Sequence, residues 1–199
     1  MLLTISTLVF DPVHYSLSEA ARRGIPATTR TLAYQPRTAL PMDPGAVPAD
    51  AVLLLDTTVY IDGMKQAGLP DAIQILLANH IVRHSALCVG ELSFGFGRLD
   101  PSHPDTPRNR SAIAAVLDRL TPGSFVDLSP SGWARAGVLA GSLARMQGFA
   151  QDRRRALFLD SALFVTAQEL GLTLVSGNLS DMDLLLRVGG AANVLLYGI

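Results

Sequence analysis

Cysteine and lysine are nearly absent from this chain of 199 residues, which contains one of each. The single cysteine, Cys88, excludes a disulfide within the chain, and its place in the apolar run SALCVGE is typical of a buried strand residue. Long apolar runs are also missing, since no stretch approaches the roughly 18 consecutive apolar residues of a membrane span. The apolar start, MLLTISTLVFDP, lacks the basic region and cleavage site of a signal peptide. We therefore expect a reducing, cytoplasmic location and no membrane partner.

An excess of charge of either sign is missing as well. The formal net charge is -1, with 17% charged and 49% hydrophobic residues. These values predict a globular protein with one core, and they exclude a wholly disordered chain and a protein covered by a broadly basic surface. Apart from Lys65 the cations are arginines, which suit phosphate, although a GC-rich genome produces the same bias.

Residues 34–50, YQPRTALPMDPGAVPAD, contain four prolines and no apolar periodicity. This composition is typical of a linker or an irregular arm. Before it, residues 6–10 predict a short strand and residues 17–24 a short helix. We therefore assign residues 1–50 to an N-terminal extension and residues 51–199 to the main domain.

From residue 51 onward, strand-like and helix-like segments alternate. Apolar runs of strand length occur near residues 51–55, 84–90, 124–128, 172–176 and 193–197. Helical spacing follows over residues 71–79, a segment carrying Glu91, and residues 111–120, 131–148, 158–171 and 183–190. This alternation predicts an α/β fold, with three α/β/α layers around a mainly parallel central sheet.

Four acids stand at the polar ends of these apolar segments: Asp56, Glu91, Asp160 and Asp181. Ligands of open α/β folds bind at the carboxyl edge of the sheet, where a carboxylate that ends a strand or opens the next helix must lie. Carboxylates gathered there would repel one another unless a divalent cation binds them. Because no His or Cys accompanies them, the oxygen ligands favour Mg²⁺ or Mn²⁺ over zinc.

The segments around these acids resemble the PIN domain, and in particular the small bacterial toxins of the VapC type. The resemblance lies in the order and spacing of LLLDTTVYID, ELSFG, LDSALFVTAQELGLTLVSGN and the Asp three residues after that Asn. It covers about residues 51–199. Ser176 stands where the family usually has Thr, and Met182 where it usually has Phe; neither change removes a carboxylate.

The resemblance implies a metal-dependent endoribonuclease that forms the toxin half of a type II toxin–antitoxin system. It also implies an RNA substrate, a cognate antitoxin and a homodimer. The alternative is a PIN-like domain that serves as a non-catalytic RNA-binding or protein-binding regulatory module. Retention of four mutually repelling carboxylates argues against that alternative.

We expect Asp56 and Asp160 to bind one or two metal ions directly, and Glu91 and Asp181 to bind directly or through water. Four neighbouring polar residues are placed either to hold carboxylates or phosphate by hydrogen bonds or to serve as turn and cap residues: Thr57, Thr58, Ser176 and Asn178.

Other residues near the motifs have two interpretations. The basic run Arg153, Arg154 and Arg155 could contact RNA or lie in a solvated loop. Asp62 and Asp183 are expected to be solvated or capping acids, and Trp133 to lie in the core or in a subunit interface.

Three explanations remain open for the N-terminal extension. Met42 could be the true start of the protein. The extension could instead pack on the domain or on the second copy of a dimer. A third hypothesis is that Arg22, Arg23 or Arg30 reaches the four acids and tempers activity.

Overall fold

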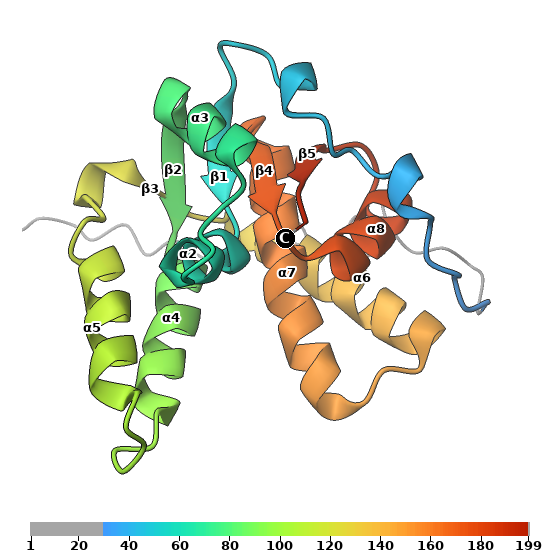
Figure 1. Ribbon diagram of the computed structural model, residues 1–199. Helices are drawn as coiled ribbons and strands as arrows, with labels where there is room; N and C mark the ends of the chain where they lie inside the picture. The colour runs from blue at the N-terminus through green and yellow to red at the C-terminus, as the bar shows by residue number, and fades with distance from the viewer. Residues whose placement is uncertain (1–29, 199) are drawn as a thin grey trace, which may run out of the picture.

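The computed structural model describes residues 30–198, so the strand and helix expected before residue 30, with Arg22 and Arg23, lie outside the described residues. Five parallel strands form one sheet in the order β3-β2-β1-β4-β5 (Figure 1). In chain order they are β1 Val52–Leu55, β2 Ile81–Ser85, β3 Phe125–Val126, β4 Thr173–Ser176 and β5 Asn193–Leu196.

Helices flank both faces of this sheet, and some extend beyond its carboxyl edge (Figure 1). They are α2 Thr57–Met64, α3 Asp71–Asn79, α4 Ala86–Arg98, α5 Thr106–Leu117, α6 Pro130–Gln147, α7 Gln151–Leu170 and α8 Leu179–Val188. The predicted three-layer α/β/α fold with a parallel sheet is confirmed. Among residues 30–198, no helix is both long enough and apolar enough to cross a membrane.

The two central strands, β1 and β4, form the middle of the core. Leu53, Leu54, Leu174 and Val175 are fully buried. Strands covered on both faces carry continuous apolar runs, which explains the segments VLLL and TLVS.

The direction of chain winding reverses between β1 and β4. The chain leaves β1 toward β2, whereas it leaves β4 toward β5 on the opposite side of the sheet. The amide of Asp56 donates to the carbonyl of Val175 at 3.0 Å and closes this junction. A crevice outside the strand ends is expected at such a reversal.

Helix α7 begins earlier than the sequence indicated. The prediction that Asp160 opens a helix is wrong, because α7 starts at Gln151 and Asp160 lies midway along it. No Gly or Pro separates Ala150 from Asp160, and Arg and Ala are good helix formers. The expectation of a solvated loop at Arg153–155 is wrong for the same reason.

Helix α4 also begins earlier than expected. Cys88 is buried, as predicted, but it lies in α4 and not in a strand. The hydroxyl of Ser85 accepts a hydrogen bond from the amide of Leu87 and caps the helix there. The apolar run crosses this boundary unbroken, so its pattern does not reveal where the strand ends.

The expected boundaries of α6 are confirmed. Ser129 caps its start by accepting from the amide of Gly132 at 2.9 Å. Gly148 ends it with φ +63°, a left-handed conformation that glycine adopts at low cost.

Residues 30–50 lie against the domain in an irregular path with two 3₁₀ turns, η1 Arg37–Ala39 and η2 Pro44–Ala46. The carbonyl of Pro41 accepts from the amide of Leu196 at 2.7 Å, beside the edge strand β5. The amide of Gln35 donates to Asp183 at 3.0 Å. Asp183 is 2% exposed, so the expectation of a solvated or capping acid is wrong there.

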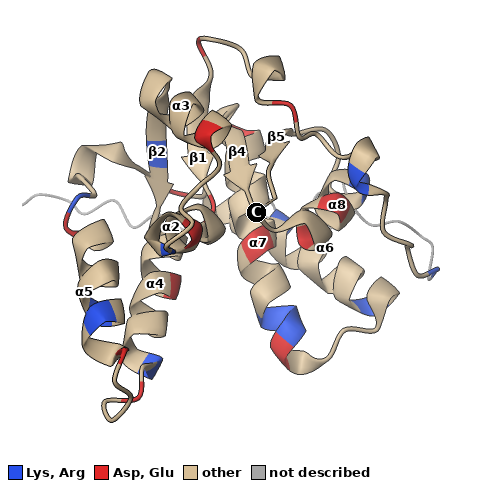
Figure 2. Ribbon diagram, viewed as in Figure 1, with Lys and Arg blue, Asp and Glu red and all other residues tan. Residues whose placement is uncertain are grey.

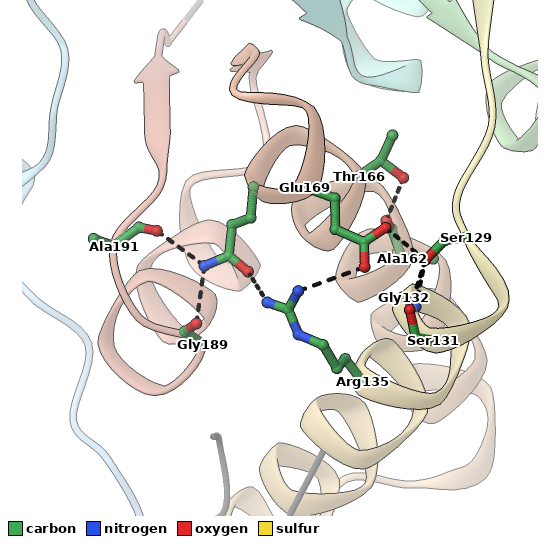
Figure 3. A network of polar contacts seen from close by, with 10 residues as sticks. Ser129, Ser131, Gly132, Arg135, Ala162, Thr166, Glu169, Gly189 and Ala191 are labelled. Carbon is green, nitrogen blue, oxygen red and sulfur yellow. Dashed lines mark hydrogen bonds and ion pairs between the residues drawn. The ribbon is translucent and has the colours of Figure 1, made fainter. Parts of the chain in front are cut away.

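A polar network joins α6, α7 and the turn after α8 (Figure 3). Arg135 of α6 donates to Gln168 at 2.9 Å and pairs with Glu169 at 3.6 Å. Gln168 donates in turn to the carbonyls of Gly189 and Ala191, whereas Glu169 accepts from Ser129. These contacts join the C-terminal end of α7 to α6 and to the turn after α8.

Glycine is required at position 132 by close approach of its neighbours. A Cβ there would lie 2.7 and 2.8 Å from the carboxylate oxygens of Glu169, which are already held by hydrogen bonds. We expect Gly132→Ala to lower the free energy of unfolding by about 1–3 kcal/mol. Urea denaturation followed by circular dichroism measures this change.

The matched control is Gly141→Ala on the same helix, where a Cβ meets no atom within 4 Å. This substitution should be neutral or should raise stability by about 0.5–1 kcal/mol, because alanine is the better helix former. Equal effects of the two substitutions would contradict the packing described at Gly132.

Candidate active site

The four predicted acids meet at the carboxyl edge of the sheet. Asp56 directly follows β1, and Asp181 lies in the first turn of α8, just after β4. Glu91 and Asp160 come from the helices α4 and α7 that extend from this edge. Figure 2 shows acidic segments of α4, α7 and α8 around the same region.

Asp56 is 3% exposed and is held through one of its oxygens. Its Oδ2 accepts from the hydroxyl of Thr58 at 2.7 Å and from that of Ser176 at 2.5 Å. These hydroxyls accept in turn from the amides of Gly177 and Asn178, each at 2.9 Å. The amides therefore orient both hydroxyls toward Asp56, which fixes the carboxylate in one position.

Asp160 and Asp181 share one side-chain partner. The side-chain nitrogen of Asn178, Nδ2, donates to Asp160 at 3.1 Å and to Asp181 at 3.0 Å. On its other oxygen, Asp181 accepts from the guanidinium of Arg153 at 2.6 Å. Arg153 also lies over the ring of Phe149, 5.2 Å from its centroid, which holds the guanidinium beside the acids.

Glu91 accepts from the hydroxyl of Thr57 at 2.5 Å. Glu91 and Asp160 are partly exposed, whereas Asp56 and Asp181 are buried. The site therefore has a buried side at the strand ends and a side open to solvent.

Crowding and burial raise the pKa values of three of the acids. The pKa of Asp160 lies well above its ordinary value of 3.8, chiefly through desolvation and then through the negative charges of Asp56 and Asp181. Desolvation also raises the pKa of Asp56 and of Glu91, although hydrogen bonds from hydroxyl groups oppose the rise. The site thus holds more negative charge than its surroundings stabilise.

A second polar cluster lies behind Asp56, and the sequence did not reveal it. Asp62 is 7% exposed, accepts from the hydroxyl of Tyr197 at 2.8 Å and pairs with Lys65 at 2.6 Å. The expectation that Asp62 is a solvated or capping acid is therefore wrong. A Cβ at Gly177 would lie 3.1 Å from the hydroxyl oxygen of Tyr197, so this cluster packs tightly against the loop after β4.

The three arginines predicted as RNA contacts have different surroundings. Arg153 binds Asp181, and Arg154 donates to the carbonyl of Phe149 at 2.6 Å. Arg155 is exposed and lines a groove beside the acids.

The donor set suits a hard divalent cation, since the four acids offer oxygen ligands. Cys88 lies near three of them, but burial raises the pKa of its thiol, which donates to the carbonyl of Leu55 at 3.4 Å. Within the described part of the chain, no three acidic, His or Cys side chains are already arranged as ligands of one ion. Magnesium takes only one or two direct carboxylates and keeps several waters, so these residues fit it without a preassembled cage.

Replacement of Asp160 by Asn should stabilise the metal-free protein at neutral pH. Because the pKa of Asp160 is raised on folding, the ionised carboxylate destabilises the folded state, and this loss grows as pH rises above the ordinary pKa. The gain should be on the order of 1 kcal/mol at pH 7 and should vanish near pH 4. Urea denaturation in the presence of a chelator measures it.

The control is Asp127→Asn, which changes an exposed acid and should shift stability by less than about 0.5 kcal/mol at either pH. An Asp160→Asn protein less stable than wild type at pH 7 would show that the carboxylate is not under repulsion.

Comparison with known proteins gives structural similarity alone: no protein-family model and no functionally curated protein matches the sequence. The chain is similar to VapBC2 of Rickettsia felis bound to a promoter DNA fragment, with 18% identity and a TM-score of 0.48 over 74% of this chain and 98% of that chain. It is similar to DNA-bound VapBC of Salmonella typhimurium, with 19% identity and a TM-score of 0.49 over 74% and 98%. VapBC-5 of Mycobacterium tuberculosis matches with 21% identity and a TM-score of 0.44 over 75% and 99%. These three structures are VapBC proteins, and their similarity to this chain is structural.

Proposed function

We propose that this chain is a metal-dependent nuclease that hydrolyses the phosphodiester bonds of RNA. The observation that carries the proposal is the convergence of four carboxylates where winding reverses between β1 and β4. A divalent cation would relieve their mutual repulsion, and the absence of nitrogen and sulfur ligands favours Mg²⁺ or Mn²⁺.

Asp56 and Asp160 are the proposed direct ligands, with Glu91 and Asp181 bound directly or through water. When bound, the cation would activate water for attack on phosphorus and offset the charge that develops on the phosphoryl group. The hydroxyls of Thr58 and Ser176 keep one oxygen of Asp56 fixed, so the carboxylate loses little conformational entropy when it binds a ligand.

By donating to both carboxylates, the side chain of Asn178 holds Asp160 and Asp181 close together, although they come from different helices. Arg153 supplies the positive charge that stabilises buried Asp181. Arg153 is 41% exposed on its side chain, so it can also reach a phosphate at the open side of the site. Together with Arg154 and Arg155 it is a proposed RNA contact.

RNA as substrate and a role as the toxin of a toxin–antitoxin pair rest on the motif resemblance to VapC-type proteins. On the same basis we propose a cognate antitoxin as partner and a homodimer as the assembly. The carboxylate geometry by itself supports metal-assisted phosphodiester hydrolysis.

Cleavage of a mixed RNA pool with Mg²⁺ or Mn²⁺ tests the proposal. Wild type should cleave, a chelator should stop cleavage, and Asp56→Asn and Asp160→Asn should each reduce it by at least about 100-fold. The control Asp118→Asn changes an exposed acid at the end of α5 and should leave the rate unchanged. Equal cleavage by wild type and both site variants would contradict the proposal.

Ser176 offers a finer test, because it binds both Asp56 and the amide of Asn178. Ser176→Ala removes the hydroxyl and should lower activity by about 10- to 100-fold. Ser176→Thr keeps the hydroxyl and should retain most of the activity. Initial rates under identical metal concentrations measure both variants, and equal losses in the two would mean that packing, not the hydrogen bond, matters there.

A further inference from the structure

A groove of about 1290 Å³ lies between α4 and α7, and one of the four acids, Glu91, lines it. Thr57 and Glu91, which share a hydrogen bond, are among its lining residues, so the groove meets the candidate site at Glu91. Val126 and Leu128 of the segment from β3 to α6 also line it, as does Trp133 of α6.

The lining residues of each helix repeat at helical spacing. On α4 they are Ala86, Leu87, Gly90, Glu91, Phe94, Gly95 and Arg98, and on α7 they are Asp152, Arg155, Ala156 and Leu159. Each helix thus carries one acid of the site near the sheet and an arginine farther out. Along the helix axes Arg98 lies about 10 Å from Glu91, and Arg155 about 7.5 Å from Asp160.

Two aromatic rings are exposed in this groove. Phe94 is 67% exposed, and Trp133, expected in the core or in a subunit interface, is 39% exposed. Each ring is steadied from one side: Arg98 lies 5.5 Å from the centroid of Phe94, and Phe158 lies 5.7 Å from that of Trp133. Exposed rings held in this way present flat apolar faces to an incoming group.

Among residues 30–198, the charges that line the groove nearly cancel. Beyond Glu91, the charged residues that line it are Arg98, Arg155, Asp127 and Asp152. A strand of phosphates would find little net attraction here, whereas flat groups with polar edges would find apolar walls, aromatic faces and scattered hydrogen-bonding groups. Nucleobases are groups of that kind.

We propose that this groove receives unpaired bases of the RNA strand that is cut, with Phe94 and Trp133 as stacking faces. The inference rests on the proposed nuclease function and adds to it a base-binding surface formed by these two side chains. A base within a duplex is already stacked and paired, so it cannot enter the groove. Continuity with the carboxylates favours RNA over a protein ligand, because the strand bound at the acids must continue into a neighbouring space.

Trp133 is the only tryptophan of the chain, so its fluorescence reports directly on the groove. The full chain is titrated with three probes of equal length. A chelator is present to prevent cleavage. They are a single-stranded RNA, the same RNA paired with its complement, and an abasic strand that keeps the phosphates. We expect the single strand to quench Trp133 and to bind at least roughly tenfold more tightly than the other two.

A matched pair of variants on α4 separates the groove from the rest of that helix. Phe94→Ala should weaken binding of the single strand by roughly tenfold or more and should raise KM in the cleavage assay. Phe96→Ala should change neither value, because Phe96, 37% exposed and covered by Arg110, is not among the residues that line the groove. If Phe94→Ala does not fold, the comparison of the three probes on wild type decides.

Equal affinity for the intact and the abasic strand would overturn the inference, as would equal effects of the two variants. Quenching of Trp133 by a protein partner but not by single-stranded RNA would overturn it too, and would make the groove a protein-binding surface. The binding assay contains no metal, so its outcome is separate from that of the nuclease proposal. If the protein cleaves RNA and Phe94→Ala has no effect, only the base-binding proposal is contradicted. If single-stranded RNA binds in the groove but is not cleaved when metal is added, only the nuclease proposal is contradicted.

Discussion

Negative charge held against the hydrophobic core is the constraint on which the site depends. Leu53 and Leu54 are fully buried, and the chain passes from them within two residues to a buried carboxylate, Asp56. Burial, and then the negative charges of the neighbouring acids, raise the pKa of Asp160 well above its ordinary value. Such an arrangement persists only where the surrounding structure holds the carboxylates in place against their repulsion. The clustered negative charge then attracts a cation strongly.

The rigidity comes from the two central strands and the short segments after them. β1 and β4 are buried on both faces, and the amide of Asp56 ties their ends together. At the end of β4, the hydroxyl of Ser176 donates to Asp56, and the side chain of Asn178 donates to Asp160 and Asp181. The amide of Gly177 between them donates to the hydroxyl of Thr58, which holds Asp56 in turn. The acids therefore gain partners from backbone that cannot move without disrupting the sheet.

Much of this arrangement could be predicted from the sequence, because it is local. The apolar runs of β1 and β4 end at Asp56 and Ser176, and a parallel sheet brings such ends together whatever the intervening loops. Helix boundaries were less accessible: no breaker marks the junction before Cys88, and the arginines before Asp160 extend α7 by helix propensity alone.

Long-range polar contacts could not be read from the sequence. Asp62 is buried because Tyr197, at the other end of the domain, reaches its carboxylate, and nothing in the neighbourhood of Asp62 indicates this. Asp183 is buried by residues of the N-terminal segment in the same way. The sequence also does not predict that Phe94 and Trp133 are exposed, because an aromatic residue in an amphipathic helix is usually assigned to the core.

The central claim is that the four acids form one cation site. Crystals of the protein soaked in Mn²⁺ and measured at the manganese absorption edge test this claim most directly. The account predicts an anomalous peak within coordination distance of both Asp56 and Asp160. No peak among the four acids at saturating Mn²⁺, with Arg153 still bound to Asp181, would contradict it.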